Sequence, residues 1–393
     1  MIDYKEIRHQ LHEHPQTAGS EQFAHDMIVR HLQGLHPDKV YTNVGGYGVI
    51  AVWMAKDSSP SQGEVPEGRR GVPTIAFRAD TDALPIGHRC GHDGHTTILL
   101  RLAELIDEVF SAQCSVCSDA TQDGDSQLNT KHSTLNTDKN ILLLWQPAEE
   151  TGTGSQAVLE SGILQQYNIV RFYGLHNLPG YPLGTVVLCP RTFAAASTGV
   201  VYHLDGRETH ASTPELGLNP GLAVAEIMTR FNGFNGQNGE FRQSTLICVR
   251  VGAPAFGTSA GHGEVMFTLR AFTNDEMERL IHDANSAVDE IAARHKLTVS
   301  RTLVEPFRAT ENNGDCVEAI EKAAEDVPLR VRYQMEPNRW SEDFAEYLLR
   351  YKGAMFGIGS GEHQPELHHP DYDFPDALIE PAAQLFFRLT TEC

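Results

Sequence analysis

The stretch RADTDALPIGHRCGHDGHT, residues 78–96, determines how the rest of the chain is interpreted. It follows residues 73–77, an apolar run typical of a buried strand. Two acids, Asp80 and Asp82, come directly after this run. Five further side chains that can bind a metal ion follow: His88, Cys90, His92, Asp93 and His95. Thiolate, imidazole and carboxylate together are the ligands of zinc and of mixed transition-metal sites, which favours a metal centre over a polar loop with a buried cysteine.

Three later segments offer the same kinds of side chain. Residues 142–150 read LLLWQPAEE, residues 172–179 read FYGLHNLP, and residues 366–374 read ELHHPDYDF. Residues 78–96 and the first two of these segments follow apolar runs, and an α/β sheet places its active site outside the carboxyl ends of its strands. The four segments together supply enough ligands for two metal ions. Two neighbouring ions are typical of hydrolases, because one lowers the pKa of a water and both stabilise the developing oxyanion.

The order and spacing of these motifs resemble the metal-dependent amidohydrolases of the aminoacylase family. That family includes hippurate hydrolases, auxin-conjugate hydrolases and related carboxypeptidases. The matching motifs are RADTDALP, CGHDGHT, QPAEE, GLHNLP, SEDF and LHHPDYDF. The resemblance runs from Ile7 to about Phe387. It implies an α/β fold, in which a mixed sheet flanked by helices forms a catalytic domain that carries an inserted α+β, ferredoxin-like small domain.

The same resemblance implies a role for each residue of the motifs. It assigns Cys90 as the ligand that can bridge two ions. The full predicted ligand set is Cys90, His92, Glu150, His176 and His368. Glu149 becomes the general base, and Asp82 a carboxylate that orients a ligand. The residues alone support a division of roles within the glutamate pair, because one carboxylate can bind metal while its neighbour transfers the proton. They do not tell which glutamate does which.

The small domain is predicted at residues 194–304, inserted into a catalytic domain made of residues 1–193 and 305–393. Periodicity predicts its strands and helices in the order β-α-β-β-α-β, typical of a split βαβ sandwich. The strands are expected at 199–204, 245–251, 265–272 and 297–303, and the helices at 220–231 and 274–295. The family uses this domain for dimerisation, which implies a possible homodimer. The segment ETHASTP, residues 208–214, resembles a family segment whose histidine helps to bind the substrate and to stabilise the transition-state oxyanion, which implies this role for His210. The alternative is that His210 is a turn histidine beside the start of a helix.

The catalytic domain is predicted to contain regular elements around its motifs. Helices are expected at residues 3–14, after Ser20 and at 97–110, with strands at 49–53 and 74–77. Residues 357–361, GIGSG, are interpreted as a tight turn bordering the site. Residues 111–140 are rich in polar residues, which indicates a surface insertion. Cys114 and Cys117 in it lack the second pair that a zinc knuckle needs.

Composition excludes several other classes of protein. The 52 acidic and 31 basic residues give a net charge of −21, which argues against nucleic acid as a partner. Apolar runs are too short for a membrane helix, and the first residues lack the apolar region of a secretory signal. Seven scattered cysteines do not indicate a disulfide framework. We therefore expect a cytoplasmic protein in which Cys90 stays reduced.

The sequence predicts a metal-dependent enzyme that cleaves the amide bond of an N-acyl or N-aminoacyl amino acid. The alternatives are a dipeptidase or exocarboxypeptidase of the same family, or a metal-binding relative without catalysis. Two divalent ions per subunit are expected, as zinc or manganese, with cobalt and nickel also suited to such ligands. Two departures from the family leave the specificity open. The loop between Ile86 and Cys90 is short, and residues 257–263 replace a family segment associated with the substrate carboxylate.

Overall fold

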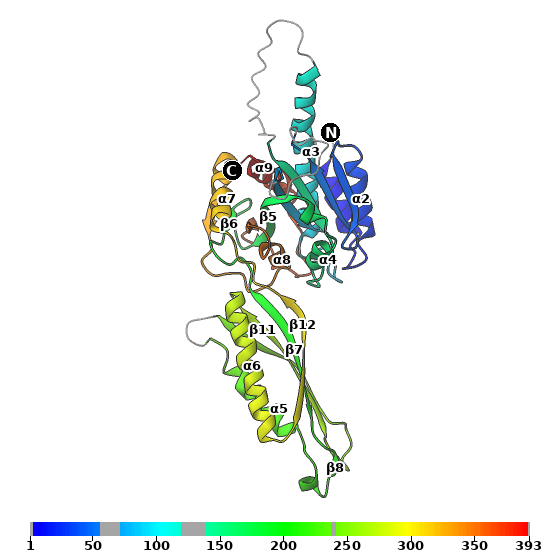
Figure 1. Ribbon diagram of the computed structural model, residues 1–393, viewed down its shortest axis with the longest axis vertical. Helices are drawn as coiled ribbons and strands as arrows, with labels where there is room; N and C mark the ends of the chain where they lie inside the picture. Colours follow the sequence, from blue (N-terminus) through cyan, green and yellow to red (C-terminus); the bar gives the residue numbers. More distant parts are fainter. Residues whose placement is uncertain (1–2, 56–70, 119–137, 237–240, 392–393) are drawn as a thin grey trace. The chain divides into compact units, whose positions relative to one another are not determined.

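The chain forms two compact units in the computed structural model, which describes residues 3–55, 71–118, 138–236 and 241–391 (Figure 1). The large unit comprises Met1–Arg191, Asn312–Met335 and Glu346–Cys393, and the small unit Thr192–Glu311 and Glu336–Ala345. The sequence had assigned residues 336–345 to the catalytic domain. Isolated bridges pair Thr192 with Glu311 and Ala194 with Asn338, so residues 336–345 contact the segment that precedes the first strand of the small unit. Most of the predicted insertion at 111–140, including the side chains of Cys114 and Cys117, lies outside the described residues.

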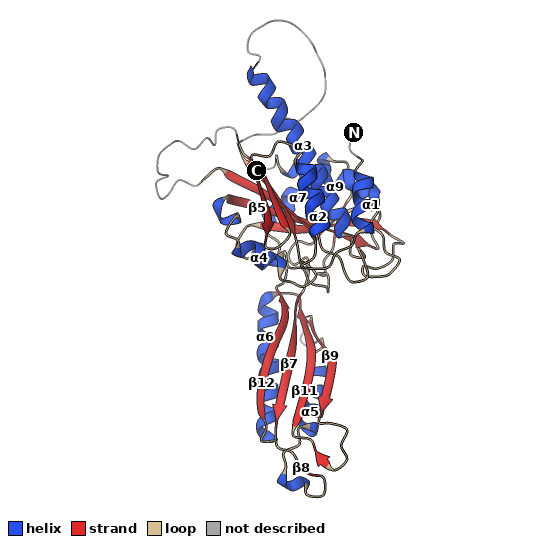
Figure 2. Cartoon of the chain, turned by 90° about the vertical axis from the view of Figure 1, so that its right-hand side faces the viewer, coloured by secondary structure: helices blue, strands red, loops and turns tan. Residues whose placement is uncertain are grey.

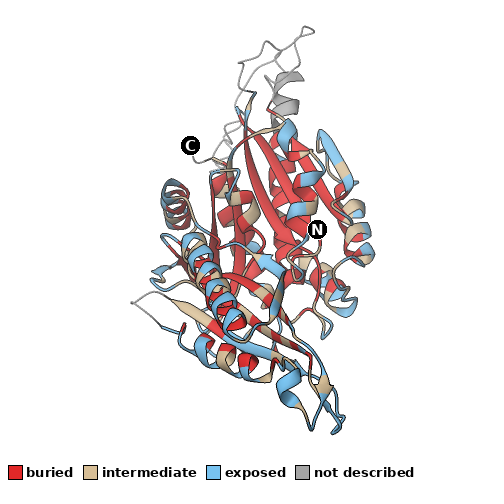
Figure 3. Ribbon diagram, turned by 60° about the horizontal axis from the view of Figure 1, so that its bottom comes forward, coloured by how far each residue is buried: buried red, intermediate tan, exposed pale blue. Residues whose placement is uncertain are grey.

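The large unit is built on a mixed eight-stranded sheet whose order is β1-β2-β4-β3-β5-β14-β6-β13. Its strands are β1 (Lys39–Val44), β2 (Gly48–Trp53), β3 (Pro73–Asp80), β4 (Asn140–Gln146), β5 (Asn168–Pro179), β6 (Val186–Leu188), β13 (Val331–Tyr333) and β14 (Gly353–Gly361). The central four, β4, β3, β5 and β14, are parallel. They are buried along nearly their whole length, because protein covers both faces of the sheet (Figure 3).

Helices cover this sheet, and several of them pack on one another over one face (Figure 2). They are α1 (Tyr4–Glu13), α2 (Gln22–Leu32), α3 (His92–Ser118), α4 (Gly154–Glu160), α7 (Gly314–Asp326), α8 (Ala345–Leu348) and α9 (Ile379–Leu389). Within the described residues, none of them is long and apolar enough to cross a bilayer. The predicted start of α3 at residue 97 is wrong, because the helix begins at His92. His92, Asp93 and His95 therefore lie in its first turn.

The predicted tight turn at residues 357–361 is also wrong, because these residues belong to the central strand β14. Its glycines are required by close packing on both sides. A Cβ at Gly357 would collide with Leu178 of β5, and one at Gly359 with the main chain of Pro182. The glycines thus mark a strand whose neighbours approach its backbone closely.

The small unit is a four-stranded antiparallel sheet with two helices, as predicted. Its elements are β7 (Ala196–Asp205), α5 (Gly221–Asn232), β9 (Arg242–Val251), β11 (His262–Ala271), α6 (Asn274–Arg294) and β12 (Thr298–Phe307). The strand order is β12-β7-β11-β9. Alternate residues of β7 and β11 are buried, which gives the unit its own core beneath α5 and α6. A second, two-stranded pair is formed by β8 (Thr209–His210) and β10 (Thr258–Ser259).

Candidate metal centre and its glutamate pair

The large unit brings six of the predicted site residues together, at the carboxyl ends of β3, β4 and β5. We call Cys90, His92, Glu149, Glu150, His176 and His368 the predicted metal cluster. Three overlapping groups have ligand atoms within 4.8 Å of one another: Cys90 with His92 and His176, Cys90 with Glu150 and His368, and His92 with Glu149 and Glu150. The Cys90 Sγ lies 3.6 Å from the His176 Nε2. Cys90, His92 and Glu150 each take part in two of these groups, and the assignment of Cys90 as the ligand shared by two ions stays a prediction.

A glycine turn between β3 and α3 delivers Cys90 and His92 to this cluster. Gly91 has a φ of 99°, in the left-handed region that glycine adopts without strain. A Cβ at this position would also collide with the side chain of Asn177. The neighbouring residue His176 lies within β5. The turn and the strand are therefore fitted to each other through Gly91 and Asn177.

The two buried imidazoles have their protons placed by the backbone. The His92 Nδ1 lies 2.9 Å from the carbonyl oxygen of Asp82, and the His176 Nδ1 lies 2.9 Å from that of Asn177. A carbonyl oxygen only accepts, so each Nδ1 carries the hydrogen and each Nε2 keeps its lone pair. Burial lowers the pKa of His92 to about 3, which keeps the ring neutral. Burial likewise lowers the pKa of His176 well below its usual value.

The Nε2 of His92 provides a direct test of whether a metal ion fits. This atom is buried and has no hydrogen-bond partner within the part of the chain that the structure describes. It lies 3.8 Å from the Oε1 of Glu150. A buried polar atom without a partner is costly, unless a ligand satisfies it. A neutral imidazole lone pair facing a carboxylate and a thiol is a donor set that suits a divalent transition metal.

The carboxylate of Asp82 contacts the main chain of the glutamate pair, and its predicted role of orienting a ligand stays a prediction. Its two carboxylate oxygens accept hydrogen bonds from the backbone N–H groups of Glu149, at 2.9 Å, and Glu150, at 3.0 Å. Its backbone carbonyl accepts a hydrogen bond from the His92 Nδ1, and its Oδ1 lies 3.8 Å from the same nitrogen. Burial raises the pKa of Asp82 well above its usual value, although the two N–H donors oppose this. The carboxylate therefore holds the main chain of the glutamate pair.

Glu21 is a residue of this region that the sequence did not reveal. Its side chain is buried, and its Oε1 accepts a hydrogen bond from the N–H of Ala148 at 2.9 Å. Ala148 has a φ of 56°, a left-handed conformation that costs a non-glycine residue about 1 kcal/mol. Glu21 and Asp82 together thus bind three consecutive N–H groups, of residues 148–150. Nothing near Glu21 in sequence signals this contact, because its partner is 127 positions away.

We expect Glu21→Ala to lower kcat by about tenfold or more, with little change in KM or in metal content. The reason is that an unheld Ala148 can leave its strained conformation and displace the Glu149 carboxylate, and small misplacements of this kind are costly to catalysis. Steady-state kinetics and metal analysis provide the measurement. Glu21→Gln keeps an oxygen acceptor and should retain most activity. Adding Ala148→Gly to Glu21→Ala should restore part of kcat, whereas an unaltered kcat in Glu21→Ala would contradict the role.

Of the remaining metal-capable residues of the stretch 78–96, Asp80, Asp93 and His95 bind protein partners, whereas the buried Nδ1 of His88 has no hydrogen-bond partner among the described residues. The His95 Nδ1 lies 2.7 Å from Asp80, which also accepts a hydrogen bond from Arg78 at 2.7 Å. Burial alone would raise the pKa of Asp80, but His92, His95 and Arg78 outweigh it and hold that pKa well below its usual range. Asp93 binds Arg8 and His12 of α1, at 3.0 and 2.8 Å. These contacts connect the first helix to the cluster.

His210 belongs to the small unit, whereas the residues of the predicted metal cluster belong to the large unit. It is exposed on the short strand β8, opposite Thr258 of β10. Its Nδ1 lies 2.7 Å from the hydroxyl of Ser212. Its role in substrate binding stays a prediction.

The large mixed sheet, its helices and the cluster of Cys, His and Glu side chains define a metal-dependent hydrolase of amide bonds, as the sequence predicted. The chain belongs to peptidase family M20/M25/M40, which matches residues 128–392.

Individual relatives are distant but cover almost the whole chain. An N-acetyldiaminopimelate deacetylase of Lacticaseibacillus paracasei is 26% identical, over 95% of this chain and 94% of its own length. A hippurate hydrolase of Campylobacter jejuni is 24% identical, over 98% of this chain and 95% of its own. Among solved structures, a dinuclear metal-binding peptidase of the M20 family from Bacillus subtilis has a TM-score of 0.78 at 22% identity, with 99% of this chain and 96% of that chain covered. The likeness confirms the predicted fold.

Proposed function

We propose that the chain hydrolyses the amide bond of N-acyl amino acids, with two divalent metal ions held by Cys90, His92, Glu150, His176 and His368. The observation that carries this proposal is the buried Nε2 of His92, which has no hydrogen-bond partner among the described residues and lies beside Cys90, Glu150 and His176. These residues belong to overlapping groups of ligand atoms, so divalent ions bound there would satisfy them. The dinuclear relative from Bacillus subtilis supports the number of ions, because it shares the fold.

In this mechanism the chain's own residues position the reactants and move one proton. Divalent ions, when bound, polarise the substrate carbonyl and lower the pKa of a water. The Glu149 carboxylate accepts the proton of the attacking water and then delivers it to the leaving amine. Asp82 and Glu21 fix the backbone of residues 148–150, and so fix where that carboxylate lies. Glu149 is buried, which excludes bulk water from the proton it carries.

The names of relatives support an N-acyl amino acid as the substrate class. Those relatives include deacetylases of N-acetyldiaminopimelate and N-acetylcysteine as well as the hippurate hydrolase. Each substrate named for these relatives bears an acyl group on the amine of an amino acid. We further infer that His210 helps to bind the substrate and that the metal is zinc or manganese. We also infer that the chain forms a homodimer through the small unit and is located in the cytoplasm. The location rests on the need of Cys90 for a reducing compartment.

The decisive experiment is hydrolysis of N-acetyl and N-benzoyl amino acids and of dipeptides by enzyme stripped with a chelator and reloaded with zinc or manganese. We expect no turnover without metal and restored cleavage of at least one N-acyl amino acid after reloading. Cleavage of dipeptides alone would instead identify a dipeptidase. An enzyme that binds two metals per chain and cleaves none of these amides would contradict the proposed function.

A further inference from the structure

A cavity of about 630 Å³ lies on the large unit, at the end of the sheet away from the predicted metal cluster. Its walls come from the amino ends of the parallel strands: Pro73 and Ile75 of β3, Ile169 and Arg171 of β5, and Lys352 just before β14. Arg171 and His176 lie five residues apart on β5, which corresponds to about 17 Å along a strand. The cavity and the cluster are therefore separate sites on the same strands.

Positive charge dominates the lining of this cavity. Its cations are Lys139, Arg171, Arg350 and Lys352, and Asp315 is the one acid among the described residues that line it. Arg171 binds a main-chain oxygen of Asp315 at 3.1 Å and the hydroxyl of Tyr173 at 3.4 Å, neither of which is charged. Arg350 and Lys352 form no ion pair with any residue that the structure describes. Such an accumulation is unexpected in a chain with 52 acidic and 31 basic residues.

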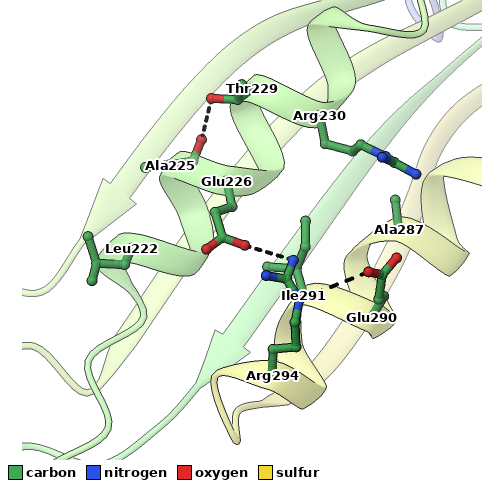
Figure 4. A pocket seen from close by; sticks show the side chains of 9 residues that line it. All are labelled: Leu222, Ala225, Glu226, Thr229, Arg230, Ala287, Glu290, Ile291 and Arg294. Atoms are coloured by element: carbon green, nitrogen blue, oxygen red, sulfur yellow. Dashed lines mark hydrogen bonds and ion pairs between the residues drawn. The ribbon is translucent and has the colours of Figure 1, made fainter.

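A groove between α5 and α6 of the small unit offers a comparison, because its lining is not equally basic (Figure 4). Its two arginines, Arg230 and Arg294, are matched by two acids, Glu226 and Glu290. Arg294 lies 2.8 Å from Glu226 and 4.0 Å from Glu290. The groove thus has balanced charges, whereas the cavity of the large unit keeps a surplus of cations. We call the latter the basic cavity.

We propose that the basic cavity binds a small anion that carries at least two negative charges attached to an apolar or planar group. Arginine side chains pair with phosphate and carboxylate oxygens through two parallel hydrogen bonds, and lysine adds a compact charge. Apolar contact is available from Pro73, Ile75, Ile169 and Val170, and from the half-buried ring of Tyr351. The volume suits a compound of small-molecule size. The shared chemistry is an organic phosphate or an organic carboxylate.

Isothermal titration of the full-length, metal-loaded enzyme tests this proposal with three probes. Phenyl phosphate carries both the dianion and the ring, inorganic phosphate only the charge, and phthalate a ring with two carboxylates. We expect saturable binding of phenyl phosphate that is tighter than that of the other two and weakens with salt. Phthalate as the tightest binder would identify a carboxylate ligand instead of a phosphate. Failure of all three to saturate would overturn the proposal.

Variants locate the bound probe. The double variant Arg350→Gln and Lys352→Gln should weaken phenyl phosphate binding about tenfold or more, as expected for the loss of charge-assisted hydrogen bonds. Both side chains are exposed, so the thermal unfolding of this variant should match the wild type. Arg230→Gln and Arg294→Gln, in the balanced groove, are the matched control and should leave binding unchanged. Undiminished binding by the first double variant would place the probe elsewhere, for instance at the metal cluster, and would refute the site.

Discussion

Glu149→Gln is expected to lower kcat by about a thousandfold or more while both metal ions remain bound. The amide keeps the size and the backbone contacts of the glutamate, but it cannot accept a proton. General-base catalysis typically contributes about 10²–10⁴ in rate, and here the same group also returns the proton to the leaving amine. The loss should therefore appear in kcat and in kcat/KM together, because the interaction removed acts in the transition state.

Metal analysis and steady-state kinetics on the best N-acyl substrate provide the measurement. Glu366→Gln, which changes an exposed glutamate near His368, serves as the matched control and should behave like the wild type. Substantial turnover by Glu149→Gln would assign the base to another residue. Loss of metal in this variant would instead make Glu149 a ligand, and Glu150→Gln would then have to be tested as the base.

Cys90→Ser is expected to weaken metal binding by about a hundredfold or more. Cys90 shares one group of ligand atoms with His92 and His176 and another with Glu150 and His368, so as the predicted shared ligand its loss should affect both ions. A serine hydroxyl stays protonated near neutral pH and is a much poorer ligand than a thiolate. Even residues that only orient a ligand typically contribute 10–100-fold to metal affinity, and a shared ligand should contribute at least as much.

Competition with a chromophoric chelator measures this affinity directly. Cys248→Ser changes a cysteine of the small unit, outside the predicted metal cluster, and should leave metal binding unchanged. Activity is not needed as a readout, so the result is independent of the substrate. Two tightly bound ions per chain in Cys90→Ser would show that Cys90 is a buried thiol beside the centre and not one of its ligands.

Elements whose signal is local were predicted well from the sequence. The helix expected at residues 274–295 is α6, Asn274–Arg294, because Thr273 and Glu276 form a capping box and one face is regularly apolar. The glycine-rich strand β14 was misassigned for the opposite reason. Its glycines leave room for Leu178 and Pro182, which come from distant positions in the chain. The local propensity of such glycines favours a turn, and only their packing in the sheet reveals the strand.

The candidate site divides in a similar way. Cys90, His92, Glu150, His176 and His368 stand in compact motifs, and the structure brings them together as expected. The support of the glutamate pair was not accessible from the sequence. Asp82 was predicted to orient a ligand through its carboxylate, and that group holds the N–H groups of Glu149 and of the predicted ligand Glu150, a contact that no motif specifies. Glu21 lies in a polar stretch without any motif, and only tertiary folding places it against Ala148.

The position of β14 within the sheet has a consequence for how the chain matures during synthesis. This strand lies between β5 and β6, but it is translated only after the whole small unit, as residues 353–361. Until then, the apolar strand β5 lacks a neighbour on one side, and its open edge is a template for pairing with other chains. The open edge of β5 is therefore exposed to aggregation while residues 180–352 are being synthesised, and a chain that ends before residue 353 cannot close its sheet.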